Sequence, residues 1–240
     1  MDSSEENFKV WSKKPFDKET IKEVYKLKKE LNQSDFNDIF HKNLEFGTGG
    51  IRGIMGIGPN RINKYSLGKA TQGICNFIHG LGTKNPKVII GYDSRNNGKY
   101  LSEVVADIFT ANNIKTYIFD EIKPTPIISF GVRELSCVCG IVITASHNPP
   151  DYNGYKVYWS DGGQIVPPID KKLIDSISRT NYTDINFAAK NNLKTTDYNK
   201  IEKEYLKKLS DYLKRINIKK EKKKLKVVFT PIHGTSYKMI

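Results

Sequence analysis

The chain has 240 residues, enough for one or two domains with a substantial core, and carries a net charge of +13 with 11% aromatic residues. Three cysteines are too few for a disulfide framework, and this aromatic content excludes a chain without a core. No run of about 18 apolar residues indicates a membrane span. The first 20 residues hold no apolar secretion signal, and their acidic side chains are atypical of a transit peptide. We therefore expect a cytoplasmic protein that contacts no membrane.

Apolar periodicity predicts helices and strands in alternation. Helices are expected at residues 17–31, 34–40, 66–79, 98–111, 126–135 and 167–178, and strands at 87–92, 114–119, 137–144, 155–159 and 225–229. Ser34 and Ser66 are the candidate N-caps of two of these helices. Residues 180–200 are rich in Asn, Thr and Lys and are predicted as a surface loop. This alternation predicts an α/β fold, with a three-layer α/β/α domain built on a mixed, mostly parallel sheet.

Most of the excess positive charge lies in residues 200–226, which carry twelve basic and four acidic side chains. Apolar residues recur there at helical spacing: Ile201, Tyr205, Leu209, Tyr212, Leu213 and Ile216. We interpret the segment as an amphipathic helix with a solvated basic face, followed by a Lys-rich linker. Because it has no recognisable nucleic-acid-binding motif, nucleic acid is the weaker hypothesis for a partner.

Two polar loops follow predicted strands, where α/β sheets place their sites. The first loop contains Arg95 in the sequence GYDSR, and the second contains Ser146 and His147 in the sequence TASHNPP. A serine hydroxyl becomes reactive when a neighbour moves its proton, and histidine titrates near neutral pH. The alternative is an ordinary polar turn. No G-x-S-x-G sequence surrounds Ser146, which disfavours a hydrolase of the α/β-hydrolase type.

A glycine-rich segment, FGTGGIRG, spans residues 46–53 and contains Arg52. Glycine backbones can direct several N–H groups at one anion, and an arginine side chain suits phosphate. The segment lacks the Lys-Ser or Lys-Thr of a Walker A loop, and no clear strand precedes it. Taken alone, it is best interpreted as a flexible turn.

The segment DYNGYKVYW at residues 151–159 is predicted to fold back as a hairpin, with a tight turn at Asn153-Gly154. Strand alternation then places Lys156 on the opposite face from Tyr155 and Val157. Lys156 would point toward the Ser146 loop. The alternative is an ordinary solvent-facing lysine.

The motifs FGTGGIRG, GYDSR, TASHNPPDYNGYKVYW and FTPIHG occur in the order typical of one family. The chain resembles the α-D-phosphohexomutase superfamily, and within it the phosphoglucomutase and phosphoglucomutase-2-type (phosphopentomutase) branch. The resemblance runs from about Trp11 to Ile240. It implies four domains in the family, of which this chain corresponds to the N-terminal portion. The implied divisions are a helical extension (1–45), domain I with the phosphoserine loop (46–190), a helix and Lys-rich linker (191–224), and the start of a similar second domain (225–240).

The resemblance also implies residue roles. Ser146 would carry a phosphoryl group and exchange it with a sugar phosphate through glucose 1,6-bisphosphate or a similar intermediate. His147 would carry protons and Lys156 would assist as an acid–base or charge-stabilising group. Arg52 and Arg95 would contact the phosphate or its loop. Phosphoryl transfer depends mainly on positioning and charge neutralisation, which suits these residue types.

The family uses Mg²⁺, bound by the phosphoserine and three aspartates of a DGDxDR loop. The chain contains no such loop, so Ser146, through its phosphate, is the one metal-linked position that the sequence identifies. We expect a phosphoglucomutase-type activity for the full-length protein and little turnover by these 240 residues alone. The alternatives are a phosphopentomutase or phosphomannomutase, or a non-catalytic module that binds hexose or pentose phosphates.

Overall fold

The computed structural model describes residues 3–196, 199–216 and 226–239. Its elements, in chain order, are α1 (Ser3–Trp11), α2 (Lys18–Glu30), α3 (Gln33–Phe40), β1 (Ile51–Ile54), α4 (Lys64–Gly80), β2 (Lys87–Tyr92), α5 (Gly98–Ala111), β3 (Lys115–Ile118), α6 (Thr125–Glu134), β4 (Cys139–Ile143), β5 (Tyr152–Trp159), α7 (Ile169–Arg179), two 3₁₀ turns (Tyr182–Asp184 and Asn191–Leu193), β6 (Lys194–Thr195) and α8 (Asn199–Arg215).

One six-stranded sheet organises the described residues, with strand order β1-β5-β4-β2-β3-β6. Strand β2 pairs in parallel with β3 and β4, and β3 pairs in parallel with β6. Strand β5 is antiparallel to both of its neighbours, β1 and β4. Only β5 therefore runs against the direction of the other strands in this sheet, which confirms the predicted mixed, mostly parallel arrangement.

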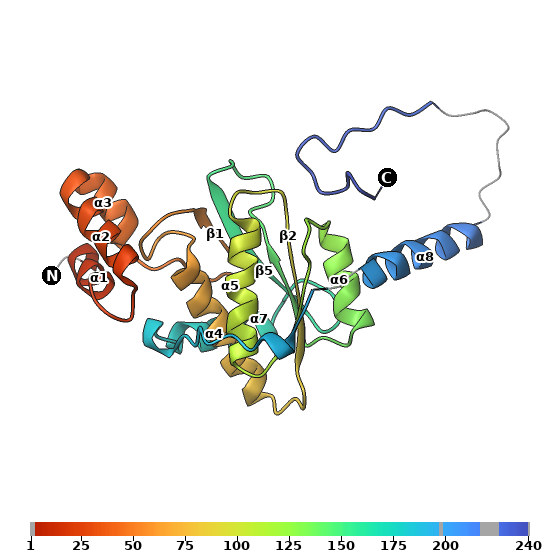
Figure 1. Cartoon of the computed structure of the whole chain (residues 1–240), viewed down its shortest axis with the longest axis horizontal. Helices are drawn as coiled ribbons and strands as arrows, with labels where there is room; N and C mark the ends of the chain where they lie inside the picture. Colours follow the sequence, from red (N-terminus) through yellow and green to blue (C-terminus); the bar gives the residue numbers. More distant parts are fainter. Residues whose placement is uncertain (1–2, 197–198, 217–225, 240) are drawn as a thin grey trace.

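Both faces of the sheet are covered, because successive side chains of its central strands point to opposite sides. Ile90 and Ile141 join the core formed with α4, α5 and α7, whereas Ile89 and Val142 join the core formed with α6 and α8. Figure 1 shows α5 and α6 on either side of the strands. The three-layer α/β/α architecture predicted from the sequence is confirmed.

The N-terminal helices α1, α2 and α3 form a small aromatic cluster beside the sheet domain (Figure 1). Trp11 stacks on Phe16 with ring centroids 4.3 Å apart, and both rings contact Tyr65 of α4. Asp17 caps α2, accepts a hydrogen bond from the Tyr65 hydroxyl at 3.0 Å and pairs with Lys64. These contacts attach the helices to the N-terminal end of α4.

Several element boundaries differ from the predictions. The caps of α3 and α4 are Asn32 and Asn63, with Ser66 completing a capping box inside α4. Helix α1 and strands β1 and β6 were not predicted. The segment 180–200, predicted as a loop, contains β6, which pairs with β3. Strands as short as β1 and β6 have little pattern of their own, since tertiary pairing defines them.

The predicted tight turn at Asn153-Gly154 is wrong. Both residues lie inside β5, and the chain reverses in the loop between β4 and β5. Gly154 is needed for close packing, because a Cβ atom there would lie 2.4 Å from the carbonyl oxygen of Ile51 and 2.7 Å from that of Thr144. The Asn153 side chain donates a hydrogen bond to the Asn96 carbonyl at 3.0 Å, which ties β5 to the loop before α5.

The predicted strand at 225–229 is not formed over residues 226–229. Val227 and Val228 are 71% and 98% exposed, and none of the described strands pairs with them. The Lys-rich linker predicted at 219–224 lies outside the described residues. Among the described helices, none is long and apolar enough to cross a membrane.

Candidate active site

Three loops meet at the carboxyl ends of the parallel strands β2, β3 and β4. They comprise residues 93–97, 119–124 and 144–151, and they border a cavity of about 860 Å³. Residues 231–237 close the cavity from a fourth side, where the Ser94 hydroxyl donates a hydrogen bond to the His233 carbonyl at 2.6 Å. The position agrees with the rule that α/β sheets bind ligands beyond the carboxyl ends of their strands.

Ser146 is exposed beside this cavity and has a left-handed backbone, with φ of 59°. This conformation costs a residue with a side chain roughly 1–2 kcal/mol. Its backbone N–H donates to the Thr144 hydroxyl at 2.8 Å. The Thr144 hydroxyl in turn donates to Asp93. The surrounding loop therefore holds Ser146 in an unfavourable conformation at the border of the cavity.

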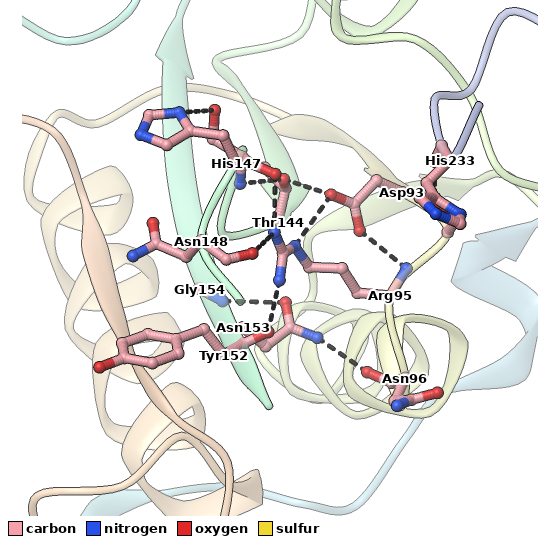
Figure 2. Close-up of polar contacts among 12 residues, drawn as sticks. Asp93, Arg95, Asn96, Thr144, His147, Asn148, Tyr152, Asn153, Gly154 and His233 are labelled. Carbon is pink, nitrogen blue, oxygen red and sulfur yellow. Dashed lines mark hydrogen bonds and ion pairs between the residues drawn. The ribbon is translucent and has the colours of Figure 1, made fainter. Parts of the chain in front are cut away.

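The guanidinium of Arg95 donates hydrogen bonds to main-chain carbonyls in and next to the Ser146 loop. Its Nη1 donates to the carbonyl oxygens of Pro149 at 2.7 Å and Tyr152 at 3.0 Å. Its Nη2 donates to those of Ser146 at 2.7 Å and Asn148 at 2.5 Å (Figure 2). Both terminal nitrogens are thus occupied by the main chain, and the side chain is only 10% exposed. In this structure Arg95 therefore shapes the loop, and its direct contact with phosphate stays a prediction.

Asp93 connects the two predicted site loops. One carboxylate oxygen accepts from Thr144, and the other accepts the Arg95 backbone N–H at 3.1 Å (Figure 2). The first oxygen also lies 3.5 Å from Nε of Arg95. Asp93 belongs to the GYDSR motif, but its hydrogen bond with Thr144 was not predicted.

His147 lies next to the serine hydroxyl, as the sequence suggests. Its Nδ1 is 3.4 Å from Oγ of Ser146, and the imidazole is exposed (Figure 2). The donor in this contact depends on the tautomer of the imidazole. The separation suits a proton exchange that tightens when a ligand binds.

Lys156 and Arg52 form a pair of like charges on neighbouring strands. Arg52 of β1 lies opposite Gly154 of β5, and Lys156 follows two residues later. Burial and the Arg52 guanidinium lower the pKa of Lys156, and Asp93 acts in the opposite direction. Two cations held together in this way favour an anion between them. Neither cation has an ion pair within the described residues, which leaves both free for such a ligand.

The glycine-rich segment is a braced turn. Gly47 and Gly50 exchange two backbone hydrogen bonds of 3.1 and 2.8 Å, and the Thr48 hydroxyl donates to buried Asp170 at 3.0 Å. Gly50 has φ of 89°, and a Cβ atom there would lie 2.0 Å from the Tyr155 carbonyl oxygen. The turn leads directly into β1 and so fixes the position of the strand that carries Arg52. This braced geometry differs from the flexible turn that was predicted for the segment alone.

The structure therefore brings Ser146 into direct contact with both His147 and Arg95, and it places Lys156 beside Arg52. It adds Lys123, a buried lysine on the cavity wall that the sequence analysis missed. The one sequence signal for Lys123 was its position after the strand at 115–118, which places it at the same edge of the sheet as the two predicted site loops. Within the described residues, no group of three His, Cys, Asp or Glu side chains is arranged to hold a metal ion.

The sheet domain that carries this site matches a known family. Residues 43–184 match the model of the family described as phosphoglucomutase/phosphomannomutase, alpha/beta/alpha domain I. The chain belongs to this family. The matched segment includes the glycine-rich turn, both site loops and β5.

Curated relatives are similar along almost the whole chain. A probable phosphoribomutase from Schizosaccharomyces pombe is 36% identical over 231 residues, covering 93% of this chain and 39% of the relative. A phosphoglucomutase from Staphylococcus aureus strain MRSA252 is 34% identical over 235 residues, covering 96% of this chain and 41% of the relative. The chain thus spans about two fifths of the length of these relatives.

Solved structures share the fold. A putative phosphomannomutase from Thermus thermophilus aligns with a TM-score of 0.55 at 23% identity, covering 70% of this chain and 36% of that one. A phosphoglucomutase/phosphomannomutase family protein from Burkholderia thailandensis gives 0.54 at 22% identity, covering 69% and 35%. At these identities the comparison supports the family's α/β architecture.

Proposed function

We propose that the chain is the N-terminal portion of a sugar-phosphate mutase of the phosphoglucomutase type, and that Ser146 carries the transferred phosphoryl group. The observation that supports this most directly is the Ser146 loop. A strained serine borders the cavity, its loop carbonyls are held by Arg95, and its hydroxyl lies 3.4 Å from His147. Family membership raises the expectation for this chemistry, while the roles of individual residues rest on the geometry.

Each phosphoryl transfer forms one P–O bond and breaks another. A sugar hydroxyl attacks the phosphorus of phosphorylated Ser146, the bond between Oγ and phosphorus breaks, and a sugar bisphosphate forms. The proton lost by the sugar hydroxyl is balanced by the proton that Oγ gains. His147, adjacent to Oγ, is the group that delivers it. The same steps in reverse, at the other phosphate of the bisphosphate, return the phosphoryl group to Ser146.

Arg52 and Lys156 neutralise the charge that spreads over the phosphoryl oxygens during transfer. Burial and the like charge of Arg52 already lower the pKa of Lys156, so a dianionic phosphate between the two cations would relieve the repulsion. Arg95 acts through the loop, since its terminal nitrogens already donate to four carbonyl groups. We assign it the role of keeping Ser146 in its left-handed conformation.

We propose Mg²⁺ as the cofactor of the full-length protein, with an oxygen of the Ser146 phosphate as one ligand. When bound, the ion supplies charge neutralisation at the transferring phosphate. The described residues do not complete a metal site, so the steps above use only side chains of this chain.

The proposed substrates are hexose or pentose phosphates, with glucose 1,6-bisphosphate as the intermediate and phosphoryl donor. The relatives named phosphoglucomutase and phosphoribomutase make both a hexose and a pentose reasonable. We propose the cytoplasm as the location, where the three buried free cysteines would remain reduced. For the domain limits we retain 1–45, 46–190, 191–224 and 225–240, and the family match at 43–184 supports the second of them.

Incubation of the chain with glucose 1,6-bisphosphate, followed by peptide mass spectrometry, tests the proposal. We expect phosphate on Ser146 and none in the variant Ser146→Ala. Phosphate found only elsewhere would contradict the assignment. The same preparation should show negligible conversion of glucose 1-phosphate, and multiple turnovers by it would show that these residues suffice. Sugar-phosphate binding without any transfer to Ser146 would favour the non-catalytic module.

A further inference from the structure

Lys123 is a buried cation in the wall of the Ser146 cavity. It lies in the loop between β3 and α6, where its backbone N–H donates to the Tyr92 carbonyl at 3.1 Å. The residue is only 8% exposed, and it borders the same cavity as Ser146 and Thr144. Burial of a lysine side chain without a counter-ion is costly, so the charge on Lys123 requires a partner.

In the structure that partner is Glu202, from a helix far along the chain. Nζ of Lys123 lies 2.5 Å from one carboxylate oxygen of Glu202 and 3.8 Å from Glu121. Glu202 belongs to α8, and its side chain is 19% exposed. Glu121 is shared with Lys238, at 2.7 Å. Glu202 is therefore the main counter-ion of Lys123.

Helix α8 brings Glu202 to this position by docking on α6. Ile201 is buried in the core beneath α6, and Tyr205 packs edge-on against Phe130 with ring centroids 5.5 Å apart. A second ion pair, Lys208 with Glu134, joins the same two helices. Figure 1 shows α8 beside α6 and pointing away from the sheet. The two pairs differ in burial, since Lys123 is 9% exposed and Lys208 is 58% exposed, and only Lys123 borders the cavity.

We propose that Lys123 binds a phosphate group of the ligand in the Ser146 cavity, and that Glu202 of α8 competes with that phosphate for the lysine. The inference rests on the proposed function for the identity of the anion, a sugar phosphate. With the cavity empty, Glu202 compensates the buried charge. When phosphate enters, Lys123 turns to it, Glu202 loses its partner, and the attachment of α8 weakens. Ligand binding and the docking of α8 are therefore thermodynamically linked.

The test is the affinity of the 240-residue chain for inorganic phosphate, measured by titration calorimetry. The variant Glu202→Gln removes the competing charge, so we expect its dissociation constant for phosphate to fall roughly five-fold. The matched control is Glu134→Gln, which breaks the other ion pair between α8 and α6, and we expect its affinity to equal that of the unaltered chain. Lys123→Gln should weaken binding, and Lys123→Arg should largely restore it.

A purely structural ion pair gives a different pattern. It predicts that Glu202→Gln and Glu134→Gln change only the melting temperature, with equal phosphate affinities. Equal affinities, weaker binding by Glu202→Gln, or no measurable binding by any variant would each overturn the proposal. A second measurement needs no substitution: phosphate should increase amide hydrogen exchange over residues 199–215 of the unaltered chain, and unchanged or slower exchange would contradict the linkage.

The outcome is separable from that of the proposed function. Phosphate affinity is read without covalent transfer, and we expect the effect of Glu202→Gln to persist when Ser146 is replaced by alanine. If Ser146 accepts no phosphate from glucose 1,6-bisphosphate, the proposed function fails while the competition remains measurable. If Ser146 is phosphorylated and Glu202→Gln leaves phosphate affinity unchanged, only the competition fails.

Discussion

Arg95 donates a hydrogen bond of 2.7 Å to the carbonyl oxygen of Ser146, the residue with the left-handed backbone in its loop. The same guanidinium holds three further carbonyl groups, of Asn148, Pro149 and Tyr152. A guanidinium has five donors in a fixed plane and can satisfy several carbonyls at once, which an ammonium group does less well. The conformation of Ser146 is therefore set by a residue 51 positions earlier in the chain.

Replacement of Arg95 should disturb stability and phosphoryl transfer together. Arg95→Ala leaves four main-chain carbonyls without their donor, and we expect a loss of about 2–3 kcal/mol in the free energy of unfolding. Transfer of phosphate to Ser146 should fall in parallel, and Arg95→Lys should recover part of both. Urea denaturation and peptide mass spectrometry measure the two effects. Arg179→Ala, which removes an exposed ion pair with Asp175, is the control and should cost under about 0.5 kcal/mol.

The left-handed conformation of Ser146 makes a second prediction, because glycine adopts it without the steric cost. The free energy of unfolding of Ser146→Gly should be about 1 kcal/mol higher than that of Ser146→Ala. Neither variant should accept phosphate. At the exposed helical Ser178 of α7 the order should reverse, with alanine more stable than glycine by roughly 0.5–1 kcal/mol. Equal stabilities of the two Ser146 variants would argue against a strained serine in solution.

The sequence predicted the regular part of this molecule well. Helix α5 was predicted at its observed bounds, 98–111, because a single amphipathic stripe faces the sheet. The Ser146 loop and Lys156 could be proposed as site residues from the sequence because reactive side chains stand out in a motif. A loop contact of Arg95 was one of two alternatives, but its acceptors could not be identified because they are main-chain carbonyls, which every residue possesses. The pairing of Lys123 with Glu202 was also missed, because 79 residues separate them and only the docking of α8 brings them together.

The error at Asn153-Gly154 has a specific physical cause and gives a third prediction. Asn-Gly is typical of tight turns, yet here the glycine accommodates the carbonyl oxygens of Ile51 and Thr144. Gly154→Ala should therefore destabilise the chain by more than about 2 kcal/mol. Gly80→Ala, at the end of α4 with nothing within 4 Å of the new Cβ atom, should stabilise it by up to about 1 kcal/mol. Denaturant titration of both variants measures the contrast, and a tolerated Gly154→Ala would contradict the close packing.

Replacement of Arg52 should reduce phosphoryl transfer with little effect on stability. Because it lies exposed beside Lys156 and has no ion-pair partner among the described residues, Arg52→Met should change the free energy of unfolding by less than about 0.5 kcal/mol. Transfer of phosphate to Ser146 should nevertheless fall at least ten-fold, since one of the two cations is lost. The pKa of Lys156 should rise when the like charge is removed, which NMR of the lysine Cε resonances can follow. A large loss of stability, or no change in transfer, would argue against this assignment.

Asp17 should make the attachment of the N-terminal helices depend on pH. Burial raises the pKa of its carboxyl group, but hydrogen bonds from Lys64, the Thr20 backbone and Tyr65 outweigh this and hold the pKa well below its ordinary value. A depressed pKa in the folded state contributes stability at pH values above the unfolded pKa of about 3.9, and this stability is lost as the pH falls toward the folded pKa.

The variant Asp17→Asn isolates that charge, because asparagine is an equally good N-cap for α2. We expect it to lower the free energy of unfolding by about 1 kcal/mol at pH 7, a modest value since the carboxyl group is partly exposed. The difference from the unaltered chain should shrink as the pH falls from 5 to about 2, as measured by urea denaturation. Asp175→Asn, at an exposed pair within α7, should show little difference at either pH. A difference for Asp17→Asn that stays constant across this range would show that the ionised carboxylate does not hold the helices in place.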